Sequence, residues 1–300
     1  MIVQTTALNK SFQNKQALYD ISLQINKRDI FGIVGPDGSG KTTLIRTILG
    51  LYLPDSGEIQ LFGQANIESC KNRLGYVPQE FSLNADMTVW ENIALFAELQ
   101  GVSDFAIRAE KLLEIVWLSS FKDRLASNLS GGMKQKLALI CSIIHNPELL
   151  VLDEPTTGVD PVSRREFWQM LYRLNKEGMT ILVSTSYMDE VELCHKIAFL
   201  QSGKFRAVGT PFELLQSYPY DLYAIKGDNM RAKIGVIYKL PASTLYFKGD
   251  LLIAAFNSEV QKEQFLLLLK QKRLQNITIS KINPSLEDLF CSLSESEKQI

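Results

Sequence analysis

A glycine-rich loop at residues 35–42 is the feature that most constrains how this chain can fold. The loop reads Gly-Pro-Asp-Gly-Ser-Gly-Lys-Thr, fits the pattern G-x-x-x-x-G-K-[ST], and lies between an apolar segment and a helix-like one. Small residues let successive backbone N–H groups point at phosphate oxygens, and the N-terminus of the following helix adds a positive dipole end. We therefore expect a strand–loop–helix unit of an α/β fold that binds the phosphates of a nucleotide.

The residues of this loop have separate expected roles. Lys41 is expected to reach the β- and γ-phosphates of the nucleotide, and the Thr42 hydroxyl to ligate Mg²⁺. The candidate nucleotide-binding residues of this region are Gly35, Pro36, Asp37, Gly38, Ser39, Gly40, Lys41, Thr42 and Thr43.

The hydrophobic pattern on either side of the loop alternates between strands and helices. Ile30–Val34, Leu149–Asp153 and Thr180–Ser184 are short apolar runs typical of buried strands. Lys41–Leu49 is typical of a helix, and Gly50 is well placed to end it. Such alternation predicts a mostly parallel sheet with helices on its faces.

Residues 80–145 interrupt that alternation with a helix-rich insertion. A helix is predicted over Thr88–Leu99, which opens with a capping box. Two more are predicted over Asp104–Leu118 and Ser130–Ile144, the latter with apolar residues at helical spacing. The first two-thirds of the chain is therefore expected to be an α/β body that carries a helical subdomain.

An apolar strand that ends in two acids supplies the second group of candidate residues. Residues 149–152 are all Leu or Val and precede Asp153 and Glu154. Ligands of open α/β sheets bind at the carboxyl ends of the strands. Asp153 is therefore placed to hold Mg²⁺, directly or through water, and Glu154 to orient and polarise an attacking water.

Residues 129–135 read Leu-Ser-Gly-Gly-Met-Lys-Gln and resemble the signature motif of ATP-binding cassette (ABC) proteins. Ser130, Gly131 and Gly132 start a predicted helix, where free backbone donors and the helix dipole suit a γ-phosphate. The resemblance implies a P-loop ABC ATPase cassette, an α/β fold with a helical signature subdomain, followed here by a small α+β C-terminal domain.

Further marks of the cassette family follow in the order typical of it. Gln79 matches the Q-loop, Asp160 lies in a match to the D-loop, and Phe12 stands where an aromatic ring stacks on adenine. The resemblance implies ATP as the substrate, with Thr42, Gln79 and Asp153 as the Mg²⁺ ligands. It also implies that Asp160 and the signature residues contact the nucleotide.

The resemblance covers the whole chain. Residues 1–217 resemble a cassette of the ABC-2 exporter class, whose members include drug-efflux ATPases, and most of all the first cassette of tandem two-cassette exporters. Residues 284–290 resemble the end of the C-terminal extension in that class. This implies a head-to-tail dimer of cassettes, each ATP lying between one phosphate loop and the other chain's signature. It also implies integral-membrane ABC-2 permease subunits, with this chain bound to them at the cytoplasmic face of the cell membrane.

One position departs from the family pattern. Ser186 stands where the family has a switch histidine, and a serine hydroxyl is shorter than an imidazole and cannot become cationic. The catalytic candidates are therefore Glu154, Gln79 and Ser186. His145 and His195, the two histidines, do not match the switch position and are expected to have solvated or structural roles. The chain is either the altered half of a heterodimer, or a homodimer in which the serine suffices.

A second, smaller domain is expected over residues 221–300, after a break at residues 217–220 that reads Ser-Tyr-Pro-Tyr. Strands are predicted there over 222–226, 244–247, 251–256 and 276–282, and helices over 229–238 and 258–271. This β-α-β-β-α-β order is the split-βαβ arrangement. The domain has neither a phosphate loop nor an acid pair, which favours docking or regulation.

Composition limits the remaining functions. With 32 Lys and Arg against 33 Asp and Glu, the net charge of −1 argues against a nucleic-acid partner. No apolar run approaches the ~20 residues of a membrane-spanning helix, and the N-terminus does not resemble a signal peptide. The 4 widely spaced cysteines fit a reducing cytoplasm.

Three functions stay open: the ATPase subunit of an ABC-2 exporter of drugs or other small molecules, a mainly ATP-binding regulatory half of an asymmetric pair, and a soluble cassette ATPase outside transport.

Overall fold

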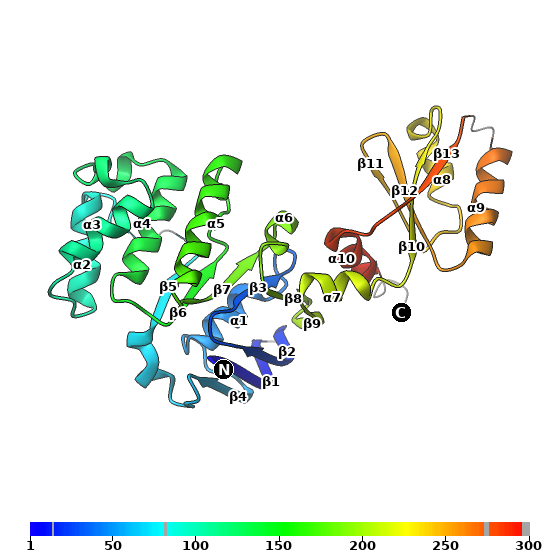
Figure 1. The fold of residues 1–300 in the computed structure, drawn as a ribbon. Helices are drawn as coiled ribbons and strands as arrows, with labels where there is room; N and C mark the ends of the chain where they lie inside the picture. Colours follow the sequence, from blue (N-terminus) through cyan, green and yellow to red (C-terminus); the bar gives the residue numbers. More distant parts are fainter. Residues whose placement is uncertain (14, 81–82, 273–275, 296–300) are drawn as a thin grey trace. The chain divides into compact units, whose positions relative to one another are not determined.

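The computed structural model describes residues 1–13, 15–80, 83–272 and 276–295. The chain divides into two compact units, Met1–Pro211 and Phe212–Ile300 (Figure 1). The first unit ends earlier than the predicted boundary at residue 217, because the short helix α7 (Pro211–Gln216) lies almost wholly in the second unit. This helix begins at Pro211, and proline is well suited to the first position of a helix.

The first unit is built on a six-stranded sheet with the order β5-β6-β7-β3-β8-β9. Its strands are β3 (Ile30–Val34), β5 (Leu74–Val77), β6 (Leu149–Asp153), β7 (Thr180–Thr185), β8 (Lys196–Gln201) and β9 (Lys204–Gly209). Neighbouring strands are parallel except for the antiparallel pair β8 and β9. Every residue of β3, β6 and β7 is buried, which accounts for the apolar residues that predominate in them. The predicted, mostly parallel α/β core is confirmed.

A three-stranded antiparallel sheet with the order β2-β1-β4 is absent from the sequence-based prediction. Its strands are β1 (Val3–Phe12), β2 (Lys15–Ile25) and β4 (Ser56–Leu61). Shifts of register interrupt the pairing of β1 with both neighbours, so polar and apolar residues do not alternate regularly along it. Helix α1 (Lys41–Ile48) lies between the two sheets, because its Leu44 shares one hydrophobic cluster with Leu8 of β1 and Val151 of β6. The phosphate loop is thereby held by both sheets.

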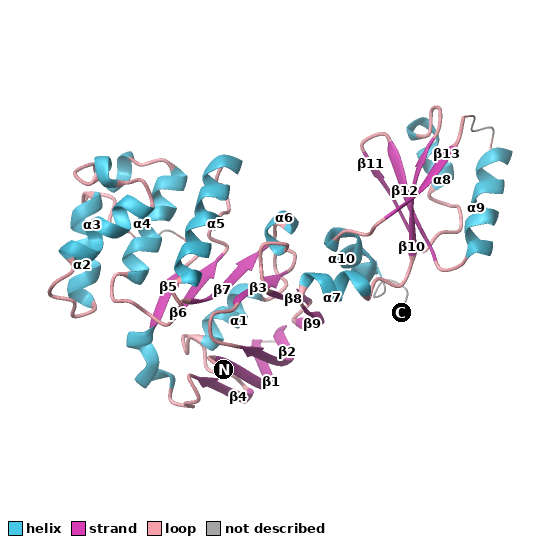
Figure 2. Ribbon diagram, in the orientation of Figure 1, coloured by secondary structure: helices cyan, strands magenta, loops and turns pink. Residues whose placement is uncertain are grey.

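The helical insertion of the first unit contains α2 (Val89–Leu99), α3 (Ala106–Ile115) and α4 (Gly131–Ile143), which lie together in Figure 2. The predicted capping box is present: the Thr88 hydroxyl accepts the Glu91 N–H, and the Glu91 carboxylate accepts the Thr88 N–H. Ser130 caps α4 by accepting the N–H of Met133. Helix α3 ends earlier than predicted, since Trp117 takes a left-handed backbone conformation (φ 57°) just beyond it.

The remaining helices of the first unit are α5 (Pro161–Lys176) and α6 (Met188–Val191), with 3₁₀ turns at Ile67–Arg73, Ser119–Phe121 and Ala126–Asn128. None of the helices in the described ranges is both long enough and apolar enough to cross a lipid bilayer.

The second unit contains a four-stranded sheet, its strands and the helices between them follow the predicted order, and it ends in a helix, α10, that was not predicted. Its elements are β10 (Asp221–Lys226), a 3₁₀ turn (Arg231–Lys233), α8 (Ile234–Ile237), β11 (Thr244–Lys248), β12 (Leu251–Phe256), α9 (Glu259–Gln271), β13 (Thr278–Ile282) and α10 (Leu286–Glu295). The sheet order β11-β12-β10-β13, with antiparallel neighbours, is the split-βαβ topology. Phe265 of α9 packs on Phe256 of β12. The helix predicted over 229–238 shrinks to the turn and α8, because Asn229 has a positive φ of 54°.

Candidate nucleotide site

The phosphate loop takes backbone conformations that its glycines make possible. Gly38 and Gly40 have positive φ angles of 74° and 109°, in the region that disfavours residues with a Cβ. Gly35 lies so close to the carbonyl oxygen of Leu200 that a Cβ would collide with it. Each glycine of the motif therefore has a structural reason, and the loop turns tightly from β3 into α1.

Lys41 is held beneath this loop and is only 4% exposed. Its Nζ donates to the carbonyl oxygens of Gly35 (2.8 Å) and Pro36 (3.1 Å). It also forms an ion pair with Glu154, at 3.0 Å from Oε1. A buried ammonium needs such partners, and the arrangement keeps the charge of Lys41 directly at the loop.

Asp153 ends β6 beside the start of α1, as the strand pattern predicts. Its Oδ1 accepts hydrogen bonds from Ser184 Oγ (2.7 Å) and Thr42 Oγ1 (3.2 Å). Its Oδ2 is buried and has no hydrogen-bond partner among the described residues. Burial raises the pKa of Asp153, while the two hydroxyl donors oppose that shift. Ser184 is a residue that sequence reasoning missed, since serine in a buried strand carries no motif.

These groups fit a magnesium ion. The described residues contain no cluster of three or more His, Cys, Asp and Glu side chains. Mg²⁺, however, is usually bound through one or two carboxylates together with substrate phosphates. The free Oδ2 of Asp153 and the hydroxyl of Thr42 supply such oxygens, and a cation there would also favour the ionised form of the carboxylate.

Glu154 follows with a backbone strained for a non-glycine residue, at φ 49°. Its N–H donates to Ser184 Oγ at 2.9 Å, which fixes the turn after β6. Its Oε2 accepts hydrogen bonds from Gln79 Nε2 and Thr157 Oγ1, both at 3.3 Å. The other oxygen, Oε1, faces Lys41 of the phosphate loop.

A cavity of about 220 Å³ lies between the loop and Glu154. Its lining residues are Asp37, Gly38, Gly40, Lys41, Thr42, Thr43, Gln79 and Glu154. The structure thus brings Glu154 and Gln79 to the predicted loop, and Asp153 meets the loop through its hydrogen bond from Thr42. Ser39 lies in the loop with its hydroxyl buried.

Ser186 lies between β7 and α6 and is half-buried. The carbonyl oxygen of the preceding Thr185 accepts the N–H of Gly35 at 3.4 Å, so this segment touches the start of the phosphate loop. The two histidines have structural contacts: His145 Nε2 lies 3.0 Å from the Leu74 carbonyl, and His195 Nδ1 accepts the N–H of Ile30. Burial lowers the pKa of His145.

The signature residues and Asp160 do not line the cavity of their own chain. Ser130 and Gly131 are exposed at the start of α4, whereas Gly132 is buried against Ser163 of α5. Asp160 caps α5 by accepting the N–H groups of Val162 and Ser163, both at 3.0 Å. A hydrogen bond from the Ser163 side chain, together with these N–H bonds, lowers the pKa of Asp160. The sequence reading missed this capping role, although Asp-Pro at a helix start is a recognisable signal.

Phe12 ends β1 and is 42% exposed, so it is not a core residue. Its ring meets Tyr52 edge-to-face, with centroids 5.2 Å apart. Tyr52 was not among the predicted site residues, because it lies outside every motif. The stacking of Phe12 on adenine stays a prediction.

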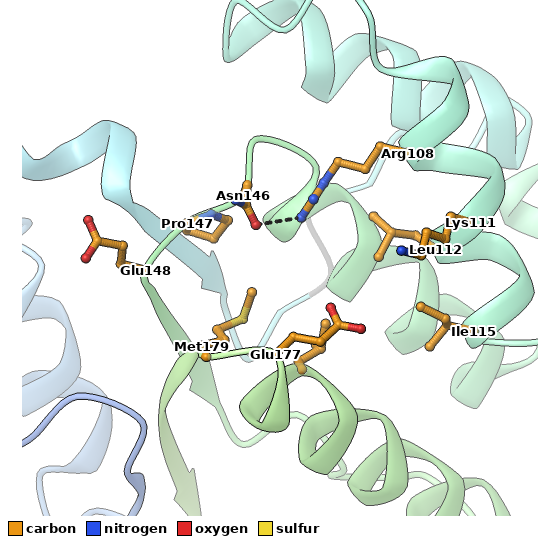
Figure 3. Close-up of a pocket in the computed structure, with 11 residues that line it drawn as sticks. Arg108, Lys111, Leu112, Ile115, Asn146, Pro147, Glu148, Glu177 and Met179 are labelled. Atoms are coloured by element: carbon orange, nitrogen blue, oxygen red, sulfur yellow. Dashed lines mark hydrogen bonds between the residues drawn. The ribbon is translucent and has the colours of Figure 1, made fainter.

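A second hollow, of about 250 Å³, lies where α3, the segment between α4 and β6, and the end of α5 meet. Arg108 of α3 reaches across it (Figure 3) and donates from Nη2 to Asn146 Oδ1 (3.1 Å) and to the Ile143 carbonyl (3.0 Å). None of the phosphate-loop residues lines this hollow. The hydrogen bonds of Arg108 join α3 to the end of α4.

Known proteins resemble this chain in sequence and in structure. A family model described as "ABC transporter" matches residues 18–157. The probable multidrug ABC transporter ATP-binding protein YbhF of Escherichia coli is 44% identical over 226 residues, which are 72% of this chain and 39% of that protein. The Nod factor export ATP-binding protein I of a Rhizobium species is 33% identical over 304 residues, 99% of this chain and 98% of that protein.

One solved structure bears on assembly as well as on fold. It is the dimeric, post-hydrolysis state of the ATP-binding cassette MJ0796 bound to ADP and Pi, with a TM-score of 0.63 and 25% identity, covering 70% of this chain and 98% of that one. The present chain thus spans 39% of the length of YbhF but nearly the whole of the Nod factor protein.

Proposed function

Because this chain belongs to the ABC transporter family, we propose that it is the ATP-binding and hydrolysing subunit of an ABC-2 type membrane exporter with drugs or other small molecules as cargo. The observation that carries the proposal is the convergence of Lys41, Asp153 and Glu154 around the phosphate loop. A cation for the phosphates, a carboxylate for Mg²⁺ and a second carboxylate for water are the groups that phosphoanhydride hydrolysis uses.

The ion pair between Lys41 and Glu154 suggests how binding prepares catalysis. The phosphates of ATP replace the Glu154 carboxylate as the partner of Lys41, which leaves that carboxylate able to orient and polarise water. Gln79 and Thr157 hold its other oxygen in place. Bound Mg²⁺, next to Thr42 and Asp153, supplies positive charge for the phosphate oxygens.

A complete ATP site also needs a γ-phosphate contact from another chain. The signature residues Ser130 and Gly131 are exposed and lie outside this chain's own cavity. In a head-to-tail dimer, each signature would cover the phosphate loop of the partner, and the MJ0796 cassette is known as a dimer with ADP and Pi bound. We therefore propose a second cassette as partner, either identical or different.

The helical insertion supports the proposal of a permease partner. Leu99 and Ile107 are 71% and 84% exposed there. The same insertion has a hollow of about 430 Å³ that is lined by residues between 94 and 105. Exposed apolar side chains beside a groove are typical of interaction sites. We propose that integral-membrane ABC-2 subunits dock on this helical insertion, so that the chain is bound at the cytoplasmic face of the cell membrane. We also propose that the second unit serves docking or regulation.

A second candidate function rests on Ser186. Without an imidazole beside the phosphate loop, the site could bind ATP and turn it over slowly, as the regulatory half of an asymmetric pair. The dimer partner would then do most of the hydrolysis.

ATP turnover by the full chain, alone and purified in detergent with its membrane partner, tests the proposal. Glu154→Gln should bind ATP at least as tightly as the parent, because Lys41 loses a competing anion, and should lower turnover by at least about 100-fold. Equal turnover by parent and variant would place hydrolysis on another chain and favour the regulatory reading. Absence of ATP binding by the parent would contradict both readings.

A further inference from the structure

One fully buried carboxylate in the first unit takes no part in the site described above. Glu190 of α6 is 1% exposed. Thr156 Oγ1 donates to its Oε1 at 2.5 Å, and Thr185 Oγ1 donates to its Oε2 at 2.6 Å. Both threonines are themselves 1% exposed. Short hydroxyl–carboxylate bonds away from water are among the stronger hydrogen bonds in proteins.

The two threonines belong to the two segments that flank the cavity. Thr156 follows Glu154 closely, on the turn after β6, and Thr185 directly precedes Ser186 at the end of β7. The Thr185 hydroxyl also accepts the N–H of Tyr187 at 3.0 Å, so it fixes the backbone on both sides of Ser186. A single carboxylate therefore holds the segment of the candidate base to the segment of the switch position.

The charge of Glu190 is balanced from the D-loop side. Arg164 lies in the first turns of α5, the helix that Asp160 caps, and its Nε is 3.7 Å from Glu190 Oε1. Its guanidinium stacks 3.9 Å from the centre of the Tyr187 ring and also bonds to Asp189 at 3.4 Å. Helix α5, which begins at the D-loop residue Asp160, is thus joined to the same carboxylate.

We propose that Glu190 is a positioning residue for ATP hydrolysis, which sets the distance between the Glu154 segment and the Ser186 segment and couples both to α5. The proposal rests on the ATPase function proposed above. Catalytic groups lose about 100-fold in rate when misplaced by about 1 Å. We call the contacts of Glu190 with Thr156 and Thr185 the brace. The brace acts on geometry, so it should affect the rate of hydrolysis and leave the phosphate-loop contacts to ATP intact.

Isosteric variants of the full chain separate the hydroxyl bonds from packing. Thr185→Val and Thr156→Val remove one hydroxyl each and keep the shape, whereas Thr185→Ser and Thr156→Ser keep the hydroxyl. Each valine variant should lower kcat for ATP at least about tenfold with KM within about twofold, and each serine variant should stay within about threefold of the parent. A matched control is Thr5→Val in β1, which also loses a buried hydroxyl bond, to the Ile21 carbonyl. It should lower thermal stability without changing kcat.

Hydrogen exchange tests the brace itself, independently of turnover. Glu190→Gln should raise amide exchange in peptides covering residues 154–160 and 184–190, and leave peptides of α2 unchanged. Unchanged exchange in the two segments would overturn the brace. If exchange is faster in Glu190→Gln but both valine variants keep the parental kcat, the brace exists but does not position groups for hydrolysis. If the parent does not hydrolyse ATP, the ATPase proposal fails and with it the catalytic role of Glu190, while the exchange result still decides whether the carboxylate joins the two segments.

Discussion

Helices α1 and α4 both begin at short, glycine-containing segments, but only the first is enclosed by its own chain. Around the start of α1, Lys41 is 4% exposed and has an acidic partner, Glu154, on the turn after β6, and α1 packs between two sheets. At the start of α4, Ser130 and Gly131 are exposed, and open space surrounds the position of a Cβ on Gly131. Two helix N-termini with the same capacity for phosphate therefore have opposite surroundings.

The difference teaches which half of a nucleotide site each segment supplies. The first holds a cation, a candidate metal ligand and a candidate base together within one chain, so ATP binding should depend on this chain alone. The second offers the backbone donors of Ser130 and Gly131, which do not line this chain's own cavity. Its contribution should appear only when another chain brings a phosphate to it.

The largest expected effect falls on the enclosed helix. Lys41→Ala should weaken ATP binding by the isolated chain by about 100-fold or more, roughly 3 kcal/mol, because the charge-assisted contacts to the phosphates are lost. Titration with ATP, followed by calorimetry or by a fluorescent analogue, measures the change.

A double variant distinguishes lost phosphate contact from lost stability. Lys41→Ala alone leaves Glu154 buried without its cation, which also destabilises the fold. Lys41→Ala with Glu154→Gln removes that unpaired charge. Restored ATP affinity in the double variant would mean that Lys41 matters for the fold and not for phosphate, and the contrast between the two helices would then fail.

The enclosed helix was also the easier one to predict. Spacing alone indicated β3, β6, the loop and the acid pair, because strands buried on both faces read as unbroken apolar runs. The sheet β2-β1-β4 was missed, since its register shifts blur the alternation. Ser184 and Glu190 were missed for a different reason: their importance comes from partners distant in the sequence, and no local pattern marks a buried hydroxyl or carboxylate.

The second prediction separates the two signature glycines of α4. Gly132→Ala would place a Cβ 2.8 Å from the Ser163 Cβ, so it should destabilise the isolated chain by about 1–3 kcal/mol. Gly131→Ala meets no neighbour, so its melting temperature should match or exceed that of the parent. Turnover in the assembled complex should nevertheless fall at least about tenfold for Gly131→Ala, because the new methyl group stands where a phosphate is expected.

Thermal unfolding and turnover of the assembled complex measure the two effects. Gly132→Ala with Ser163→Gly serves as the control, since it removes the opposing Cβ and should recover most of the stability. A Gly131→Ala complex with parental turnover would show that the exposed N-terminus of α4 does not complete any site.

The smallest effect concerns Ser186, whose segment touches the enclosed loop through the Thr185 carbonyl. If the missing imidazole limits this site, Ser186→His should raise turnover of the isolated chain. A positioned acid–base group typically contributes ~10²–10⁴-fold. We expect only about tenfold, because Glu154 is already in place and the serine hydroxyl supplies part of the contact.

Ser186→Ala is the matched control. Where alanine equals the parent and histidine exceeds it, the serine contributes nothing and the chain is the weaker half of an asymmetric pair. Where alanine removes most of the parental rate, the serine is a working substitute. The enclosed half-site is then competent as it stands, and a homodimer needs no better partner than a second copy of its own signature.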